Sequence, residues 1–75
     1  MKTKQELYDL YKANASLADW ERYDFVDPPY CWAAAITLDV DGYHFEGEGQ
    51  IILDTDREIE ELWCDTPEGE HIKII

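Results

Sequence analysis

The chain has 75 residues and a formal net charge of −12 at pH 7. This length allows a single domain, residues 1–75, with one modest core, and the 45% hydrophobic content is too high for an acidic disordered tail. The negative charge argues against direct binding to nucleic acid or to an anionic membrane, and it favours a partner with a basic surface.

The first predicted element is a helix close to the start of the chain. Residues 3–6 have the capping-box pattern, in which the Thr3 side chain accepts a hydrogen bond from the first turn and the Glu6 side chain reaches back. Apolar residues then recur at helical spacing, with most charged residues on the other side. These apolar residues are Leu7, Leu10 and Tyr11. We therefore expect this helix to pack on an apolar surface and to end at Asn14.

A second, shorter helix is predicted after the first. Residues 16–19 form another start signal, which predicts one or two helical turns. The residues directed inward would be Leu17 and Trp20, with Tyr23 either inward or partly exposed. The Asp-Pro-Pro sequence at 27–29 must end any helix, because neither proline can donate a backbone hydrogen bond and each restricts the residue before it. We therefore predict a helical segment with a proline-containing linker over residues 1–30, and an acidic antiparallel sheet over residues 31–75.

Residues 32–40 alternate in the period of a β-strand. The pair Asp41-Gly42 follows and predicts a hairpin with a type I′ turn. With this pair as the loop, apolar or small residues of the two strands face one another. The expected pairs are Val40 with Tyr43, Leu38 with Phe45, Ile36 with Gly47, Ala34 with Gly49, and Trp32 with Ile51. The other, acidic face has Asp39 opposite His44, Thr37 opposite Glu46, Ala35 opposite Glu48, and Ala33 opposite Gln50.

Residues 56–64 have two interpretations. A capping-box pattern at 55–58 and apolar residues at helical spacing favour a short helix. Those apolar residues are Ile59, Leu62 and Trp63. A strand is the alternative that we prefer, because residues 66–69 form a turn signal and residues 71–75 suit a strand that needs a hairpin partner. The fold expected is α+β, with an N-terminal helix, plus a short second helix, packed on one face of an antiparallel β-meander of three to four strands.

The sequence contains no motif that specifies a catalytic or metal site. Cys31 and Cys64 lack CxxC spacing and are expected to be buried, reduced thiols. His44 and His71 lack the spacing of zinc ligands, and one calcium-loop-like stretch has isoleucine where the loop needs glycine. We therefore expect no enzymatic activity, no cofactor and no metal ion. The absence of a signal-peptide pattern or a membrane-span-length apolar run predicts a cytoplasmic protein, in the host cytoplasm if a phage encodes it.

Glu46 and Glu48 are expected to project from the acidic face of the hairpin, because Ala33 and Ala35 beside them are too short to cover them. Alternate residues of a strand lie about 6.6 Å apart, comparable to the separation of successive phosphates along a nucleic-acid strand. The acids lack the interleaved lysines of an ordinary solvated face. Tyr30 and Tyr23 are expected to be partly exposed, and an exposed tyrosine beside carboxylates would be an anchor for a basic protein surface. The candidate partner-binding residues are Asp39, Glu46, Glu48, Asp54, Asp56, Glu58, Glu60, Glu61 and Tyr30.

In size, in acidity and in its acidic stretches at residues 46–48 and 54–61, the chain resembles small phage-encoded anti-CRISPR and anti-restriction proteins. The resemblance is one of class and carries over no functional residue. It implies a protein that mimics the charge of nucleic acid and inhibits a nucleic-acid-binding protein, with a CRISPR effector complex or a restriction enzyme as the target. Carboxylates would replace phosphates and displace the same counterions.

Two other functions fit the same composition. An immunity protein or antitoxin would neutralise a basic toxin by plugging its active site. An acidic assembly domain would instead join a basic partner or a second copy of the chain, as a homodimer, through an edge strand at residues 70–75.

Overall fold

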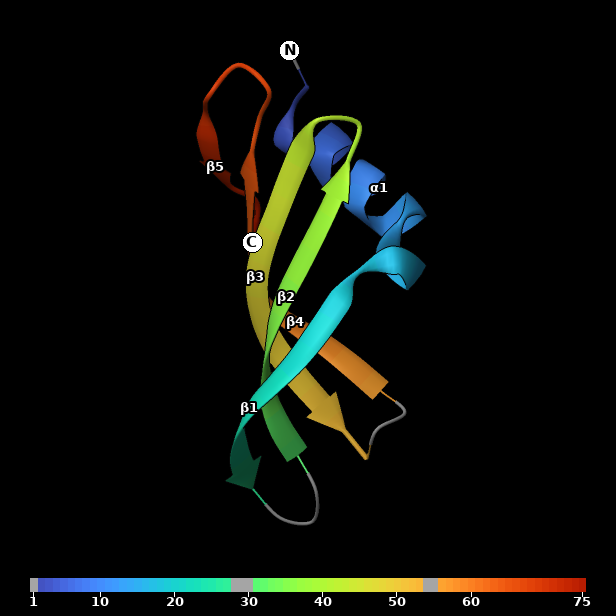
Figure 1. Ribbon diagram of the computed structural model, residues 1–75, viewed down its shortest axis with the longest axis vertical. Helices are drawn as coiled ribbons and strands as arrows, with labels where there is room; N and C mark the ends of the chain where they lie inside the picture. Colours follow the sequence, from blue (N-terminus) through green and yellow to red (C-terminus); the bar gives the residue numbers. More distant parts are fainter. Residues whose placement is uncertain (1, 28–30, 54–55) are drawn as a thin grey trace.

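The computed structural model describes residues 2–27, 31–53 and 56–75. One α-helix packs against one face of a five-stranded antiparallel sheet, whose strands lie side by side in chain order (Figure 1). The elements are α1 (Lys4–Ala13), a 3-10 turn (Ala15–Leu17), β1 (Asp19–Asp27), β2 (Cys31–Val40), β3 (Tyr43–Ile52), β4 (Asp56–Asp65) and β5 (His71–Lys73). This arrangement confirms the α+β meander expected from the sequence, with one strand more than the three to four that the pattern predicts.

Helix α1 begins where the capping-box pattern predicts. The Glu6 amide donates to Thr3 Oγ1 over 3.2 Å, and the Thr3 amide donates to the Glu6 carboxylate over 2.9 Å. The bond from the Thr3 amide, helped by the Thr3 side chain, holds the pKa of Glu6 below its ordinary value. At the other end, Asn14 Nδ2 donates to the Leu10 carbonyl oxygen over 3.0 Å, so the helix ends at the expected residue.

The predicted second helix is wrong beyond its first turn. The 3-10 turn is followed directly by β1, in which the chain is extended. Leu17 is 72% exposed and so is not buried as expected, whereas Trp20 is half-buried. Tyr23 is 56% exposed, which agrees with the prediction of a partly exposed tyrosine. A helix of one or two turns is marginal by itself, and aromatic residues of this segment favour a strand that can pair with β2. The sheet therefore begins at residue 19 and not at residue 31.

The β2–β3 hairpin has the predicted register at every predicted pair. Asp41 and Gly42 have φ angles of 51° and 82°, and positive φ at both loop residues is what a type I′ turn requires. The segment with two interpretations is strand β4, not a helix. Pairing with β3 explains this outcome, because it places Leu62 and Cys64 in the core with no exposed surface.

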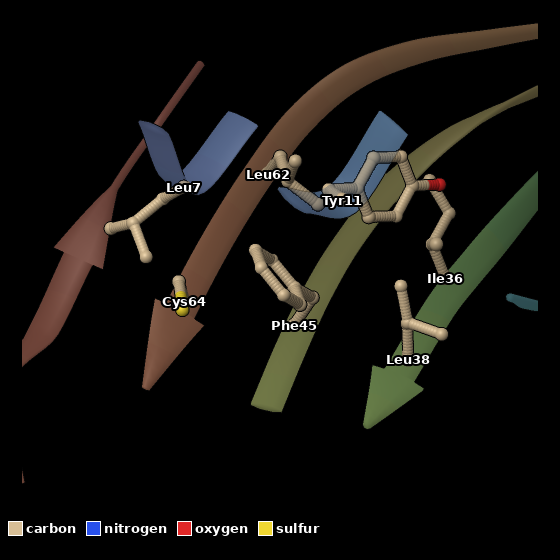
Figure 2. Packing of buried hydrophobic residues seen from close by; sticks show 7 residues of the cluster. All are labelled: Leu7, Tyr11, Ile36, Leu38, Phe45, Leu62 and Cys64. Atoms are coloured by element: carbon tan, nitrogen blue, oxygen red, sulfur yellow. The ribbon is translucent and has the colours of Figure 1, made fainter. Parts of the chain in front are cut away.

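The core lies between α1 and the half of the sheet nearest the β2–β3 turn (Figure 2). The Tyr11 and Phe45 rings pack at a tilt with their centroids 5.7 Å apart, and Trp20 packs against the same cluster. Seven buried residues form the cluster: Leu7, Tyr11, Ile36, Leu38, Phe45, Leu62 and Cys64. In Figure 1 the described helix covers only this half. In the other half, where β1 and β3 end, the apolar side chains of the inner surface must be covered by other side chains and not by α1.

Strand β4 passes very close to two glycines of β3. A Cβ atom added at Gly47 would lie 2.2 Å from the Glu61 carbonyl oxygen, and one added at Gly49 would lie 2.2 Å from the Glu58 carbonyl oxygen. The Trp20 ring, which reaches across from β1, would lie 3.0 Å from the same added atom at Gly49. Only glycine fits at these two positions, and the close approach that they allow curves the sheet.

Candidate functional site

The sheet has two faces of different character. We call the face that packs against α1 the inner face and the opposite one the outer face. Residues that pair across antiparallel strands lie on the same face, so the register defines rows of side chains on the outer face. Four of these rows are Asp24, Ala33, Gln50 and Glu58; Glu21, Ala35, Glu48 and Glu61; Asp19, Thr37, Glu46, Trp63 and Lys73; and Asp39, His44, Asp65 and His71.

The outer face brings together the described members of the predicted binding set. Five of them stand in the rows and are exposed: Asp39, Glu46, Glu48, Glu58 and Glu61. Asp56 is exposed at a register position of the same face. Glu60 has no partner in β3, and its charge acts on Tyr23, which places it within reach of the face. Tyr30 and Asp54 lie outside the described residues.

Strand β1 adds three carboxylates that the sequence interpretation missed. They are Asp19, Glu21 and Asp24, all exposed on the outer face. The sequence interpretation misses them because it predicts a helix, and not a strand, for this segment. The signal that identifies them is the alternation of acids with Trp20 and Arg22, which has the period of a strand.

The two arginines of the chain lie on the inner face. The Arg22 guanidinium lies 5.6 Å from the centroid of the Trp32 ring, and the Arg57 guanidinium lies 5.6 Å from the centroid of the Trp20 ring. These cation–π contacts cover part of each tryptophan ring on the inner face. Both guanidinium groups therefore stand on the face of the sheet opposite the four rows.

The centre of the outer face concentrates negative charge. Glu48 and Glu61 are direct cross-strand partners, and like charges in that position destabilise a sheet. Tyr23 occupies a β-bulge in β1 and is exposed. Partial desolvation, followed by the charges of Glu48, Asp24 and Glu60, raises the pKa of Tyr23. An exposed tyrosine therefore stands among these carboxylates.

The outer face is also hollowed between β1 and β2. A hollow of about 310 Å³ is lined by Asp19, Trp20, Glu21, Ala35 and Thr37. The short Ala35 and Thr37 side chains explain the depression, and two carboxylates stand on its β1 side. A lysine or arginine side chain of a partner would find opposite charge here.

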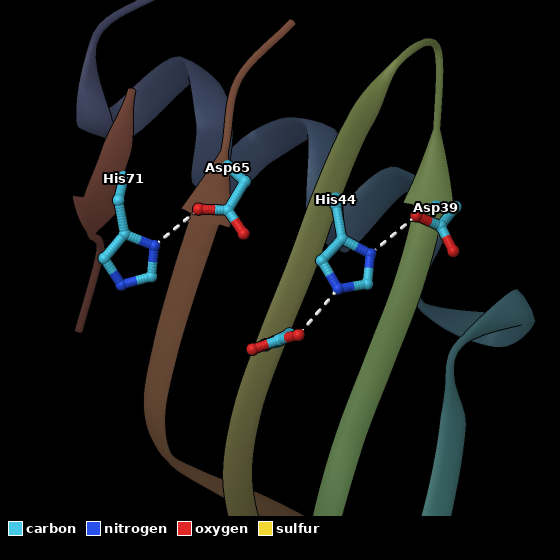
Figure 3. Close-up of polar contacts among 5 residues, drawn as sticks. Asp39, His44, Asp65 and His71 are labelled. Atoms are coloured by element: carbon cyan, nitrogen blue, oxygen red, sulfur yellow. Dashed lines mark hydrogen bonds and ion pairs between the residues drawn. The ribbon is translucent and has the colours of Figure 1, made fainter. Parts of the chain in front are cut away.

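The row nearest the β2–β3 turn alternates carboxylate and imidazole (Figure 3). His44 Nδ1 lies 2.6 Å from Asp39 Oδ1, and His44 Nε2 lies 2.9 Å from Glu46 Oε1. The hydrogen bonds that His44 makes to Asp39 and, to a smaller extent, to Glu46 raise the pKa of His44. His71 Nδ1 is hydrogen-bonded to Asp65, and the His71 ring stacks on Trp63 with centroids 4.5 Å apart.

Neither cysteine resembles a reactive thiol. Cys64 is buried, and this burial, with the nearby Asp65, raises the pKa of its thiol to about 11. Cys31 is half-buried and its Sγ donates to Gln50 Oε1 over 3.3 Å. Among the described residues, no three histidine, cysteine or acidic side chains are grouped so that they could hold a metal ion.

No family model, curated protein or solved structure matches this chain. Within the described residues, α1 and any other helical segment are too short or too polar to cross a membrane.

Proposed function

We propose that this chain binds and inhibits a nucleic-acid-binding protein, and that its outer face occupies the basic surface on which nucleic acid would lie. The observation that carries the proposal is the separation of charge between the two faces. Strands β1 to β4 all contribute carboxylates to the outer face, and both arginines are held on the inner face by tryptophan rings. Such a face would displace the same counterions as a phosphate backbone.

The spacing of the carboxylates supports the same function. Neighbouring strands lie about 4.8 Å apart and alternate residues of one strand about 6.6 Å apart, so acids of the outer face stand at intervals similar to those of phosphates. The exposed Tyr23 supplies an aromatic anchor among them. The class resemblance of the chain implies that the target would be a CRISPR effector complex or a restriction enzyme in the cytoplasm of a bacterium infected by a phage.

A competition pull-down tests the function directly. Tagged protein is incubated with a bacterial lysate that contains CRISPR and restriction systems, and the captured proteins are eluted with short duplex DNA and identified by mass spectrometry. We expect one nucleic-acid-binding complex to be enriched and then released by the DNA. A specific partner that DNA does not release would contradict mimicry and would favour the immunity-protein or assembly function.

The substitution Glu61→Lys distinguishes between two roles of the outer face, which either binds a partner or only confers solubility. It converts the repulsive Glu48–Glu61 pair into an attractive one, so the free energy of unfolding in urea should rise by about 0.5–1 kcal/mol. Affinity for the captured partner should fall, because a positive charge enters the centre of the outer face. Glu68→Lys, in the exposed β4–β5 turn, makes the same change in net charge and should alter both quantities little. Unchanged affinity of Glu61→Lys would assign the face to solubility alone.

A further inference from the structure

The Asp39–His44–Asp65–His71 row, which we call the histidine row, crosses four strands of the outer face. Figure 3 shows the side chains of the row on the side of the sheet away from α1. The row therefore belongs to the surface that the proposed function uses, and any charge that it gains changes that surface.

The geometry around His44 favours its doubly protonated form. A neutral imidazole can donate a hydrogen bond through only one ring nitrogen, whereas an imidazolium donates through both. His44 has a carboxylate oxygen within 2.9 Å of each nitrogen. Both carboxylates can accept at the same time only when the ring carries its second proton.

The charged groups that face His44 are carboxylates on every neighbouring strand. Asp39 faces it from β2, Glu46 lies beside it on β3, and Asp65 is its partner on β4. Beyond Asp65, β5 contributes His71. The local field therefore draws a proton to this ring, and histidine is the side chain whose ordinary titration lies closest to neutral pH.

We propose that His44, within the histidine row, makes the binding of a basic partner to the outer face depend on pH, with tighter binding as the pH rises from 6 to 8. This inference rests on the proposed function. When His44 is protonated, a positive charge stands between Asp39 and Glu46 and repels the partner's cations. When His44 is neutral, it carries no positive charge that would offset the negative charges of Asp39 and Glu46 as they face the partner. By linkage, a bound basic partner must also lower the affinity of His44 for its proton.

Folding stability and binding should respond to pH in opposite directions. Because the pKa of His44 is raised by the fold, its contribution to stability is complete below the unfolded value near 6.5 and is lost as the pH rises through the folded value. Acid therefore strengthens the pairing within the row and weakens the attraction for a partner. A general loss of structure at one pH would move both quantities together.

The test measures the affinity for a synthetic oligo-arginine peptide at pH 6 and pH 8, at constant ionic strength. The peptide keeps its charge over this range because arginine stays protonated. The wild-type protein should bind about two- to fivefold more weakly at pH 6. His44→Gln should reduce this pH dependence more than His71→Gln does, because His44 has a carboxylate at each ring nitrogen and His71 has one carboxylate. An NMR titration should place the His44 midpoint lower when the peptide is present.

The outcomes separate the inference from the function on which it rests. Equal wild-type affinity at pH 6 and pH 8 overturns the inference and leaves the proposed function intact. A pH dependence that survives in His44→Gln and disappears in His71→Gln overturns the assignment to His44. No binding of the peptide at either pH overturns the proposed function, and the inference with it.

Discussion

Replacing both Glu46 and Glu48 with lysine should lower the affinity for a basic partner by at least about 100-fold, because two close ion pairs become two repulsive pairs. Both side chains are exposed on the outer face, so the variant should remain folded. Isothermal titration calorimetry with the partner from the pull-down measures the loss, and far-UV circular dichroism checks the fold.

A matched control keeps the change in net charge and moves it away from the outer face. Asp9→Lys with Glu68→Lys places the same two new lysines on α1 and in the β4–β5 turn, and both sites are exposed. Screening over a Debye length of about 8 Å limits their effect at physiological salt, so affinity should fall by no more than about threefold. Equal losses in the two variants would mean that the partner senses only total charge.

The substitution Gly49→Ala should lower the free energy of unfolding by about 3 kcal/mol, which is the upper end of the range for overpacked sites. The added Cβ would meet the Glu58 carbonyl oxygen at 2.2 Å and the Trp20 ring at 3.0 Å. A backbone oxygen in a paired strand cannot move without breaking the β3–β4 ladder. Urea denaturation followed by tryptophan fluorescence measures the effect.

Gly69→Ala is the matched control for this prediction. An added Cβ there meets no atom within 4 Å, although φ is +89°. Its cost should therefore be the conformational one alone, about 1 kcal/mol. Similar losses at the two glycines would show that the close approach of β4 to β3 contributes little to stability.

The parts of the fold that the sequence predicts well are those set by local signals. The capping box at Thr3 and Glu6 places α1 correctly, and the Asp41-Gly42 turn fixes the β2–β3 register, and with it the outward positions of Glu46 and Glu48. In both cases a few neighbouring residues determine the structure by themselves.

The bulges explain why β1 and β4 were harder to predict. In β4 the extra residue Glu60 separates Ile59 from Leu62, so two inner-face residues stand three apart, which is the spacing of a helix. In β1 the extra residue Tyr23 breaks the alternation in the same way. No local pattern identifies a bulge, because it forms only when the neighbouring strand is in place. Of the three carboxylates that β1 adds to the outer face, only Asp24 lies beyond the bulge, and Asp19 and Glu21 were missed because the start signal at residues 16–19 predicts a helix.

The position of the two arginines has a consequence for how the molecule approaches a partner. Guanidinium groups on one side of a single sheet and carboxylates on the other give the protein an electric dipole directed across the sheet. The field of a basic surface exerts a torque on such a dipole and turns the outer face toward the surface before contact. Productive collisions then become more frequent, and the association rate should fall with added salt more steeply than the dissociation rate rises.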